Sequence, residues 1–522
     1  MSLADRIPSI QRSLDAQRVF NILWLAGAAF TAGVILMLLL QRLGVPMPLL
    51  LVATAIWIFI STFVLSWMGR TMTSAPYFFA GRIAGSAPLG LGGLTDWIGG
   101  SFLVLFFSAS LTGKMILAPS LMLGLLLQAT LFAVAFQRTG VATLPGFFAW
   151  RSRSQLAGGA VLVVVIIILS LLIVAEFSIA QNMFAKIALV EPNSAAWFVV
   201  ILAVIPTLMG GWLSLVILNG VISVWLLICV LSPAIITGFF PNLLRAGLER
   251  DYNGQSIAPL QSIGEQFLLP SGANSNTVMM LVSVMVLSAG FSVIPHALSR
   301  VALNKRHIAA IESLGWSALG AFLILSALPL SIGLIGINPS SSTLALLLKS
   351  QPVLYMLPNL ALFFAAYNAL CVTVFALSSA IVRTMRRSRN LDPGEQSMFS
   401  TRLLAVLVCI SLVYIPWKLI PSSNSLLAMA LSIGAGSIFI PLVASIWLSS
   451  IPRLALILSV LIGAIVVCFG ITSGIFGILL SGALGMVASG SAIIIGRMIF
   501  LIRKPGLPDP RLLELRQPDS YH

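Results

Sequence analysis

The stretch PLGLGGLTDWIGGSFLVLFFSASLTG, residues 88–113, decides the fold. It is long and apolar enough to cross a membrane, yet Gly90, Gly92, Gly93, Gly99 and Gly100 interrupt it around one acid, Asp96. An unwound segment inside a membrane is tolerated only where it lines a cavity or is buried in protein. The stretch therefore predicts a broken membrane helix whose peptide groups can bind an ion or a solute.

A second interrupted stretch, NTVMMLVSVMVLSAGFSVIPHALSR, covers residues 276–300. Its breaking and polar residues are Ser288, Gly290, Ser292, Pro295 and His296. The two stretches are the third and the eighth apolar segments of the chain, five apart. Interrupted segments at matching positions of two halves indicate a transporter built from inverted repeats, with its solute site at the interface of the repeats.

The composition excludes a water-soluble protein. Of the 522 residues, 59% are hydrophobic and 8% are charged, and the mean hydropathy is +1.07, whereas soluble domains carry about 25% charged residues. The net charge of +15 would fit a nucleic-acid partner in a soluble protein, but the basic residues here lie in short loops between apolar runs, where they set orientation. The sequence has no HExxH motif, no paired carboxylates and only three histidines, so we expect neither an enzyme nor a cofactor.

Fourteen segments are long and apolar enough to span a membrane as helices. Their approximate limits are 19–41, 47–69, 88–112, 115–137, 156–182, 194–209, 212–238, 275–298, 308–336, 353–384, 401–421, 424–449, 453–473 and 475–501.

The basic residues predict the orientation of these spans. When the N-terminus is placed in the cytoplasm, 22 of the 29 Lys and Arg residues fall on the cytoplasmic side of the membrane. The seven on the opposite side are Arg42, Lys114, Lys186, Arg245, Arg250, Lys349 and Lys418. This bias predicts cytoplasmic termini on both ends of a multi-pass protein. We expect the plasma membrane, which in a bacterium is the inner membrane, with lipid as a partner and no nucleic acid.

Two acids, Asp96 and Glu176, fall well inside predicted spans. A charge at the centre of the bilayer costs about 2.5–3.5 kcal/mol on insertion scales, so such residues usually face a cavity or a partner. Asp96 is a candidate for the ion or solute pathway, and its alternative is a structural hydrogen bond or helix cap. Glu176 has two interpretations: it belongs to the same ion or solute pathway, or it is a protonated side chain packed in the protein interior.

Several segments resemble motifs of one transporter family. They are YFFAGR at 77–82, TLPGFFAWRSRS at 143–154, GGWLSLVILNGVISVWLLI at 210–228, IPHALSRVALNKRHIAAIESLGW at 294–316 and SSAIVRTM at 378–385. Their order and spacing resemble those of the sodium/solute symporter family over residues 77–450. The PH-containing segment is most similar to the acetate and monocarboxylate permease branch.

The resemblance implies an all-α integral membrane protein of about 14 transmembrane helices with a LeuT-like five-plus-five inverted-repeat core. The implied divisions are a cytoplasmic segment with two extra helices (1–76), the core (77–450, with repeats of about 88–240 and 275–449), two C-terminal helices (451–503) and a cytoplasmic tail (504–522). The implied function is cation-coupled uptake of a small organic solute, with sodium as the ion and a monocarboxylate such as acetate as the solute.

A sodium site follows from the resemblance, residue by residue. The TDWIGG segment places ligand carbonyls at Leu94 and Trp97 with Asp96 beside them, and SSAIV places a small-residue trio at Ala365, Asn368 and Ala369. Ala369 carries no hydroxyl and Asn368 stands where the family has Ser, so coupling to protons, or to no ion, stays open. The sequence also departs from the family pattern at Leu218, Asn219, Val224, Thr384 and Met385.

We expect the solute between the two breaks, near the middle of the membrane. The candidate contacts are Gly99, Gly100, Ser101, Glu176, Gln181, Ser288, Gly290 and Ser292, together with Asn368. No Lys or Arg lies in the middle of a predicted span, so a carboxylate solute would depend on helix N-termini and hydroxyl groups. For most of the small residues, close helix packing is the alternative.

The altered sodium trio leaves a second function open. A relative that has lost transport would act as a sensor or as a subunit of a membrane complex. Such a protein would need a protein partner, because the chain contains no output module of useful size.

Overall fold

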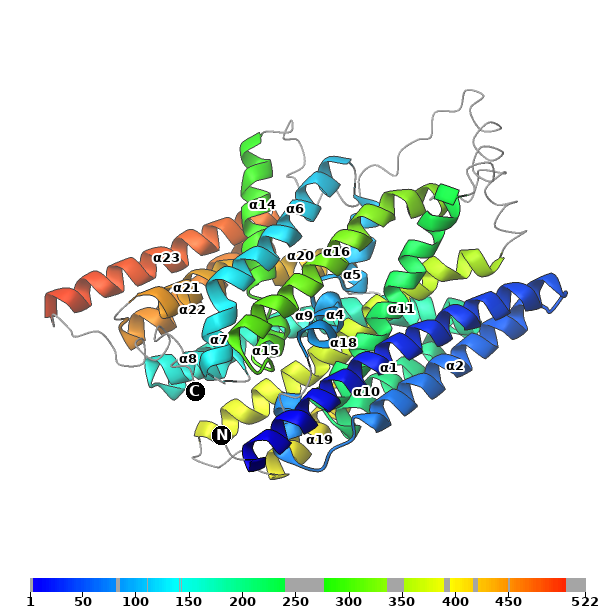
Figure 1. Cartoon of the computed structure of the whole chain (residues 1–522). Coiled ribbons are helices and arrows are strands. Elements are labelled where there is room, and N and C mark those ends of the chain that lie inside the picture. The colour runs from blue at the N-terminus through cyan, green and yellow to red at the C-terminus, as the bar shows by residue number, and fades with distance from the viewer. Residues whose placement is uncertain are drawn as a thin grey trace, which may run out of the picture.

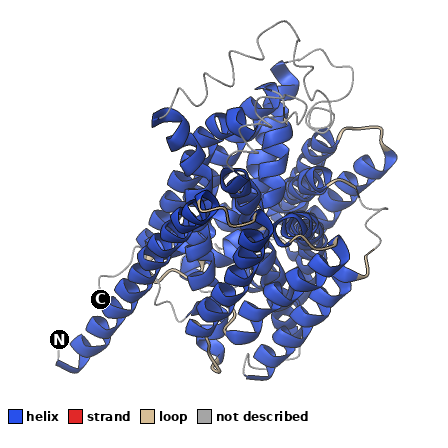
Figure 2. Cartoon of the chain, turned by 90° about the vertical axis from the view of Figure 1, so that its right-hand side faces the viewer, coloured by secondary structure: helices blue, strands red, loops and turns tan. Residues whose placement is uncertain are grey.

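The computed structural model describes residues 3–80, 85–109, 111–139, 141, 143–239, 277–335, 352–388, 395–415, 421–448 and 451–503. All regular elements within these ranges are helices, as Figure 2 shows. Residues 241–274, a polar stretch between two predicted spans, and the predicted cytoplasmic tail at 504–522 lie outside the described residues, as does part of the basic stretch at 383–402.

The described helices follow the predicted spans in order. In chain order they are α1 (Leu3–Arg42), α2 (Met47–Met68), α3 (Ser74–Phe79), α4 (Ser86–Trp97), α5 (Gly100–Ser108), α6 (Leu111–Leu127), the π-helical η2 (Gln128–Phe132), α7 (Ala133–Thr139), α8 (Leu144–Ser152), α9 (Gln155–Ala188), α10 (Pro192–Met209), α11 (Trp212–Phe239), α14 (Thr277–Ser292), α15 (Pro295–Val301), α16 (His307–Ile335), α18 (Pro352–Ser388), α19 (Glu395–Val413), α20 (Ser423–Gly434), the π-helical η4 (Ala435–Phe439), α21 (Ile440–Trp447), α22 (Arg453–Ser473) and α23 (Ile478–Arg503).

Among the described residues, twelve helical segments are long and apolar enough to cross a membrane, and the number rises to 14 when each of two bent helix pairs counts as one span. Each of the fourteen corresponds to one predicted span. The predicted multi-span membrane architecture is therefore confirmed.

The two bent pairs fall at the predicted breaks. The axes of α4 and α5 differ by 57°, and those of α14 and α15 differ by 50°. Ile98 and Gly99 leave the helical conformation between α4 and α5. Between α14 and α15, Pro295 lacks an N–H group and fits best at the first position of a new helix, which is where it stands. Both interruptions are thus encoded locally.

The contacts between helices in the first five spans of the core recur in the second five spans. Helix α4 packs against α11 and α16, and its counterpart α14 packs against α20 and α6. Helix α9 packs against α10 and α20, and its counterpart α18 packs against α19 and α11. Exchanging the first five spans of the core with the second five reproduces these contacts. Helices α9 and α18, the third span of each repeat, also pack against one another.

Four of the described membrane-spanning helices lie outside this repeat. Figure 1 shows α1 and α2 on one flank of the bundle and α22 and α23 on the opposite flank. Helices α1 and α2 contact α11, whereas α22 and α23 contact each other and η4. The two broken helices lie between these flanks, in contact with α9, α11, α16, α18 and α20.

Gly90 allows the close packing of α4 against α16. A Cβ at Gly90 would lie within 2.6 Å of the Trp316 Cβ and closer still to the Ser313 carbonyl oxygen, while the Ser317 hydroxyl donates to the Gly90 carbonyl at 2.6 Å. Gly315, on the exposed side of α16, has no atom within 4 Å of its Cβ position.

We expect Gly90→Ala to lower the stability of the protein by about 1–3 kcal/mol, because the added methyl group must push the two helices apart. Gly315→Ala is the matched control and should be neutral or slightly stabilising, since it improves helix propensity without a clash. Thermal unfolding in detergent compares the two variants, and an equal response of both would contradict the proposed packing role.

Candidate functional site

An ion pair joins the two broken helices inside the bundle. Asp96, in the last turn of α4, receives hydrogen bonds from Arg300, in the last turn of α15, at 2.6 Å from Nε to Oδ2 and 3.0 Å from Nη2 to Oδ1. The side chains of Arg300 and Asp96 are 4% and 0% exposed. His296 lies 3.2 Å from the Asp96 carbonyl oxygen through Nε2, and because a carbonyl can only accept, that nitrogen carries the hydrogen. The end of α4 is therefore held to α15 by three polar contacts, one from the start of α15 and two from its last turn.

The position of Arg300 corrects the expectation from the sequence. The predicted span ended at residue 298, which placed Arg300 in a cytoplasmic loop, but its guanidinium is buried. Gly92 and Gly93 make room for it, because Cβ atoms there would lie 3.3 Å from Nη1 and 3.1 Å from Cδ of Arg300. The Trp212 ring lies 5.2 Å from the guanidinium carbon, within cation–π range. A basic side chain is thus present at the first break.

A chain of amides continues from Arg300 to α18. When the Asn219 amide on α11 is oriented so that its oxygen faces a donor and its nitrogen faces acceptors, it accepts from Arg300 Nη2 at 2.9 Å and donates to the Asn368 side-chain oxygen and to the Leu215 carbonyl. The Asn368 amide nitrogen donates to the Thr95 hydroxyl at 2.8 Å and to the main-chain carbonyl of Asn219 at 3.3 Å. Asn219 and Asn368 are both 0% exposed. Four helices, α4, α11, α15 and α18, thus meet in one buried polar network.

This network surrounds the residues that the family resemblance gave for sodium. The Leu94 carbonyl accepts the Ile98 N–H at 3.0 Å, and the Ala369 carbonyl accepts the Thr373 hydroxyl at 2.9 Å. Trp97 and Ala365 are buried. Both oxygens of Asp96 are bound by Arg300, and the side-chain oxygen of Asn368 is bound by Asn219, so the side-chain oxygens among the candidate ligands are already hydrogen-bonded within the protein.

On the other side of the first break, Glu176 from α9 binds the start of α5. Its Oε2 accepts the Gly100 N–H at 2.8 Å, and its Oε1 accepts the Ser101 N–H at 3.3 Å and the Ser101 hydroxyl. Glu176 is 3% exposed. A Cβ at Gly99 would collide with the Glu176 carboxylate. The structure therefore brings together four of the predicted solute contacts, Gly99, Gly100, Ser101 and Glu176, around one carboxylate.

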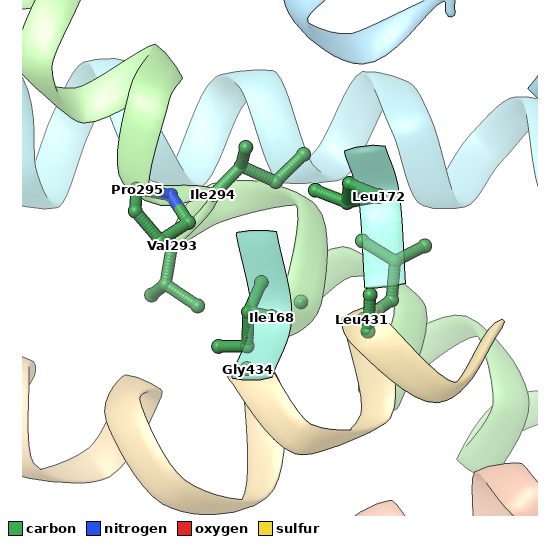
Figure 3. Close-up of a pocket in the computed structure, with 9 residues that line it drawn as sticks. Ile168, Leu172, Val293, Ile294, Pro295, Leu431 and Gly434 are labelled. Carbon is green, nitrogen blue, oxygen red and sulfur yellow. The ribbon is translucent and has the colours of Figure 1, made fainter. Parts of the chain in front are cut away.

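The second break contributes mainly apolar surface. Ile168 and Leu172 of α9, Val293, Ile294 and Pro295 at the break, and Leu431 and Gly434 of α20 line an apolar pocket, which Figure 3 shows, and this pocket has no room for a water molecule. Of the predicted contacts here, Gly290 lines the pocket. The hydroxyls of Ser288 and Ser292 donate to carbonyls of their own helix, those of Val284 and Ala289.

Gln181 lies in a different environment. Its amide donates to the Pro192 carbonyl at 2.9 Å, and it lines a polar cavity of about 380 Å³ with Ser178, Asn193 and Ser422 among others. This cavity lies between the end of α9 and the starts of α10 and α20. Gln181 is therefore not grouped with the residues at the breaks.

Sequence reasoning missed Arg300, Asn219 and Thr95 as members of the site. Arg300 belongs to the quoted segment at 294–316, and Asn219 was noted only as a departure from the family pattern. A usable signal was the buried acid itself: a carboxylate inside a membrane requires a partner, and Arg300 ends the other interrupted segment.

We expect Arg300→Met to destabilise the protein by about 3–5 kcal/mol, because it leaves the buried Asp96 carboxylate without its partner. Adding Asp96→Asn should restore part of this loss, so the two substitutions will not be additive. Arg453→Met, at an exposed position, is the control. Thermal unfolding of the single and double variants in detergent gives the coupling, and additive effects would contradict a direct pair.

Two solved structures share the fold. A substrate-bound, outward-open Na⁺-coupled sialic acid symporter aligns with a TM-score of 0.66 at 14% sequence identity, covering 87% of this chain and 98% of that chain. MHP1, a nucleobase-cation-symport-1 family transporter in a closed conformation with bromovinylhydantoin bound, aligns with a TM-score of 0.52 at 12% identity, covering 84% and 97%. The fold is that of the LeuT-like transporters, with a five-plus-five inverted-repeat core.

The sequence comparisons agree with the fold. No curated protein sequence matches this chain. The sequence profile of the sodium:solute symporter family matches residues 77–350, which is more than half of the chain and includes both broken helices. The chain therefore belongs to the sodium:solute symporter family.

Proposed function

We propose that this protein carries a small organic solute across a membrane together with a cation, sodium being the first candidate and the proton the alternative. The observation that carries the proposal is family membership over residues 77–350, a region that contains both breaks. We further propose that residues 77–450 form the transporting core, in the plasma membrane, with both termini in the cytoplasm.

The proposed cation site lies beside the first break, at the predicted carbonyls of Leu94 and Trp97 and at the trio of Ala365, Asn368 and Ala369. Sodium is a hard cation, and by analogy with calcium and magnesium it prefers oxygen ligands. Asn368 is the one member of the trio with a side-chain oxygen. In this proposal the Asn368 amide turns from Asn219 to the ion when sodium enters, while Asp96 stays paired with Arg300 and holds α4 in place.

The resemblance of the PH-containing segment favours a monocarboxylate such as acetate as the solute. The position of Glu176 argues against an anion, since this carboxylate already occupies the peptide N–H groups at the start of α5. A solute panel must therefore include acids, zwitterions and neutral compounds.

One observation favours the second candidate function, a family relative without transport. The oxygens of Asp96 and Asn368 are both engaged within the protein, and Ala365 and Ala369 offer no side-chain oxygen. A protein of this kind would act as a sensor or as a subunit of a membrane complex, through a protein partner that remains bound during purification.

Uptake into proteoliposomes tests the two functions. We expect a sodium gradient, compared with an equal potassium gradient, to drive uptake of at least one member of a panel of acetate, pyruvate, lactate, proline, pantothenate and glucose. Asn368→Ala should remove the sodium dependence, because it removes the one side-chain oxygen of the trio, whereas Asn193→Ala, at an exposed position, should not.

Thermal unfolding of the purified protein adds a binding measurement, because a ligand that binds the folded state raises the melting temperature by mass action. A solute whose effect requires sodium supports coupled transport. Neither uptake nor stabilisation with any solute, together with a reproducible co-purifying protein, would contradict transport and support the second function.

A further inference from the structure

The start of α5 is a place where a transported carboxylate would be expected to bind. Peptide N–H groups at a helix N-terminus point outward, and the helix dipole favours negative charge there. In this protein the carboxylate comes from the chain itself, because Glu176 reaches across from α9 to the Gly100 and Ser101 N–H groups and to the Ser101 hydroxyl. An anionic solute would find these donors occupied and a negative charge beside them.

The Glu176 carboxylate can accept a hydrogen bond from one more donor. An ionised carboxylate offers about four acceptor positions, and Glu176 receives three donors, from Gly100 and Ser101. Among the described residues, no basic side chain forms an ion pair with it, since Arg300 is paired with Asp96. The start of α5 contributes only about half a positive charge. When Glu176 is ionised, negative charge therefore remains at this position, and it suits a cation.

An apolar pocket lies one helical turn from Glu176 along α9. Leu172, which lines the pocket, precedes Glu176 by four residues on α9, so the two side chains share a face of that helix about 6 Å apart along its axis. Val293 and Ile294 at the second break and Leu431 of α20 complete the aliphatic wall (Figure 3). A charged position and an aliphatic surface thus stand one helical turn apart, between the two breaks.

We propose that the transported solute is a small amphipathic organic amine, an inference that rests on the proposed transport function. Glu176 takes the place at the start of α5 where the carboxylate of a solute would otherwise bind. The ammonium group of the amine binds Glu176, and its short aliphatic part lies against Leu172, Ile168 and Leu431. The pocket has no room for a water molecule in this structure, so it must widen when the solute enters. Gly290 and Gly434 also line the pocket, and they let the backbones of α14 and α20 approach closely when the pocket is empty.

Three probes that share a propyl group test the proposal: propylamine carries an ammonium head group, butyrate a carboxylate and butyramide a neutral amide. We expect propylamine to raise the melting temperature of the full-length protein in a sodium-dependent way and butyrate to have no effect. Glu176→Gln should weaken propylamine binding by about tenfold or more, because it removes a charge-assisted hydrogen bond. Glu312→Gln, which removes an exposed acid on α16, should leave binding unchanged.

The outcomes separate this inference from the function on which it rests. Stabilisation by butyrate or acetate in the presence of sodium would overturn the amine assignment and leave coupled transport intact. Propylamine binding that survives Glu176→Gln would overturn the role of Glu176. If that variant fails to fold, the preference of the unmodified protein between propylamine and butyrate decides the question. No response to any probe or panel solute would count against the transport function itself.

Discussion

The Asp96–Arg300 ion pair is the interaction on which the interior of this protein depends. It joins the end of α4, in the first repeat, to the end of α15, in the second, at 2.6 Å, and both side chains are buried. Because each charge has the other as its ion-pair partner, the two broken helices must keep their register for either to be tolerated inside a membrane. The glycines at 92 and 93 are part of the same arrangement, since they leave the space that the guanidinium fills.

The pair also divides the first break into two environments. On the side of α4, the network through Asn219 and Asn368 reaches the residues that the family resemblance assigns to sodium. On the side of α5, Glu176 bonds the peptide groups of Gly100 and Ser101. An ion beside α4 and a solute beside α5 would share the short unwound segment at Ile98 and Gly99. Movement of this segment on binding one would alter the position of ligands for the other, which is a physical route for coupling.

Much of the fold could be predicted from the sequence because it depends on local signals. Apolar runs of spanning length gave fourteen segments, and the glycines around Asp96 and the Pro295 position gave both breaks. The site was less accessible, because it depends on side chains that reach between helices. Arg300 looked like a loop residue from hydropathy, and nothing local to Glu176 indicates that it bonds the start of α5, 75 residues away. Gln181 looked equivalent to Glu176 on the same helix, yet it faces a separate polar cavity.

The central claim is that a cation and a solute bind together at the two broken helices. Equilibrium binding of radioactive sodium to the purified protein, measured with and without a solute that stabilises it, tests this claim directly. The account predicts saturable sodium binding that the solute strengthens, with the reciprocal effect of sodium on the solute required by linkage. Saturable solute binding that is indifferent to sodium, with no saturable sodium binding, would contradict it.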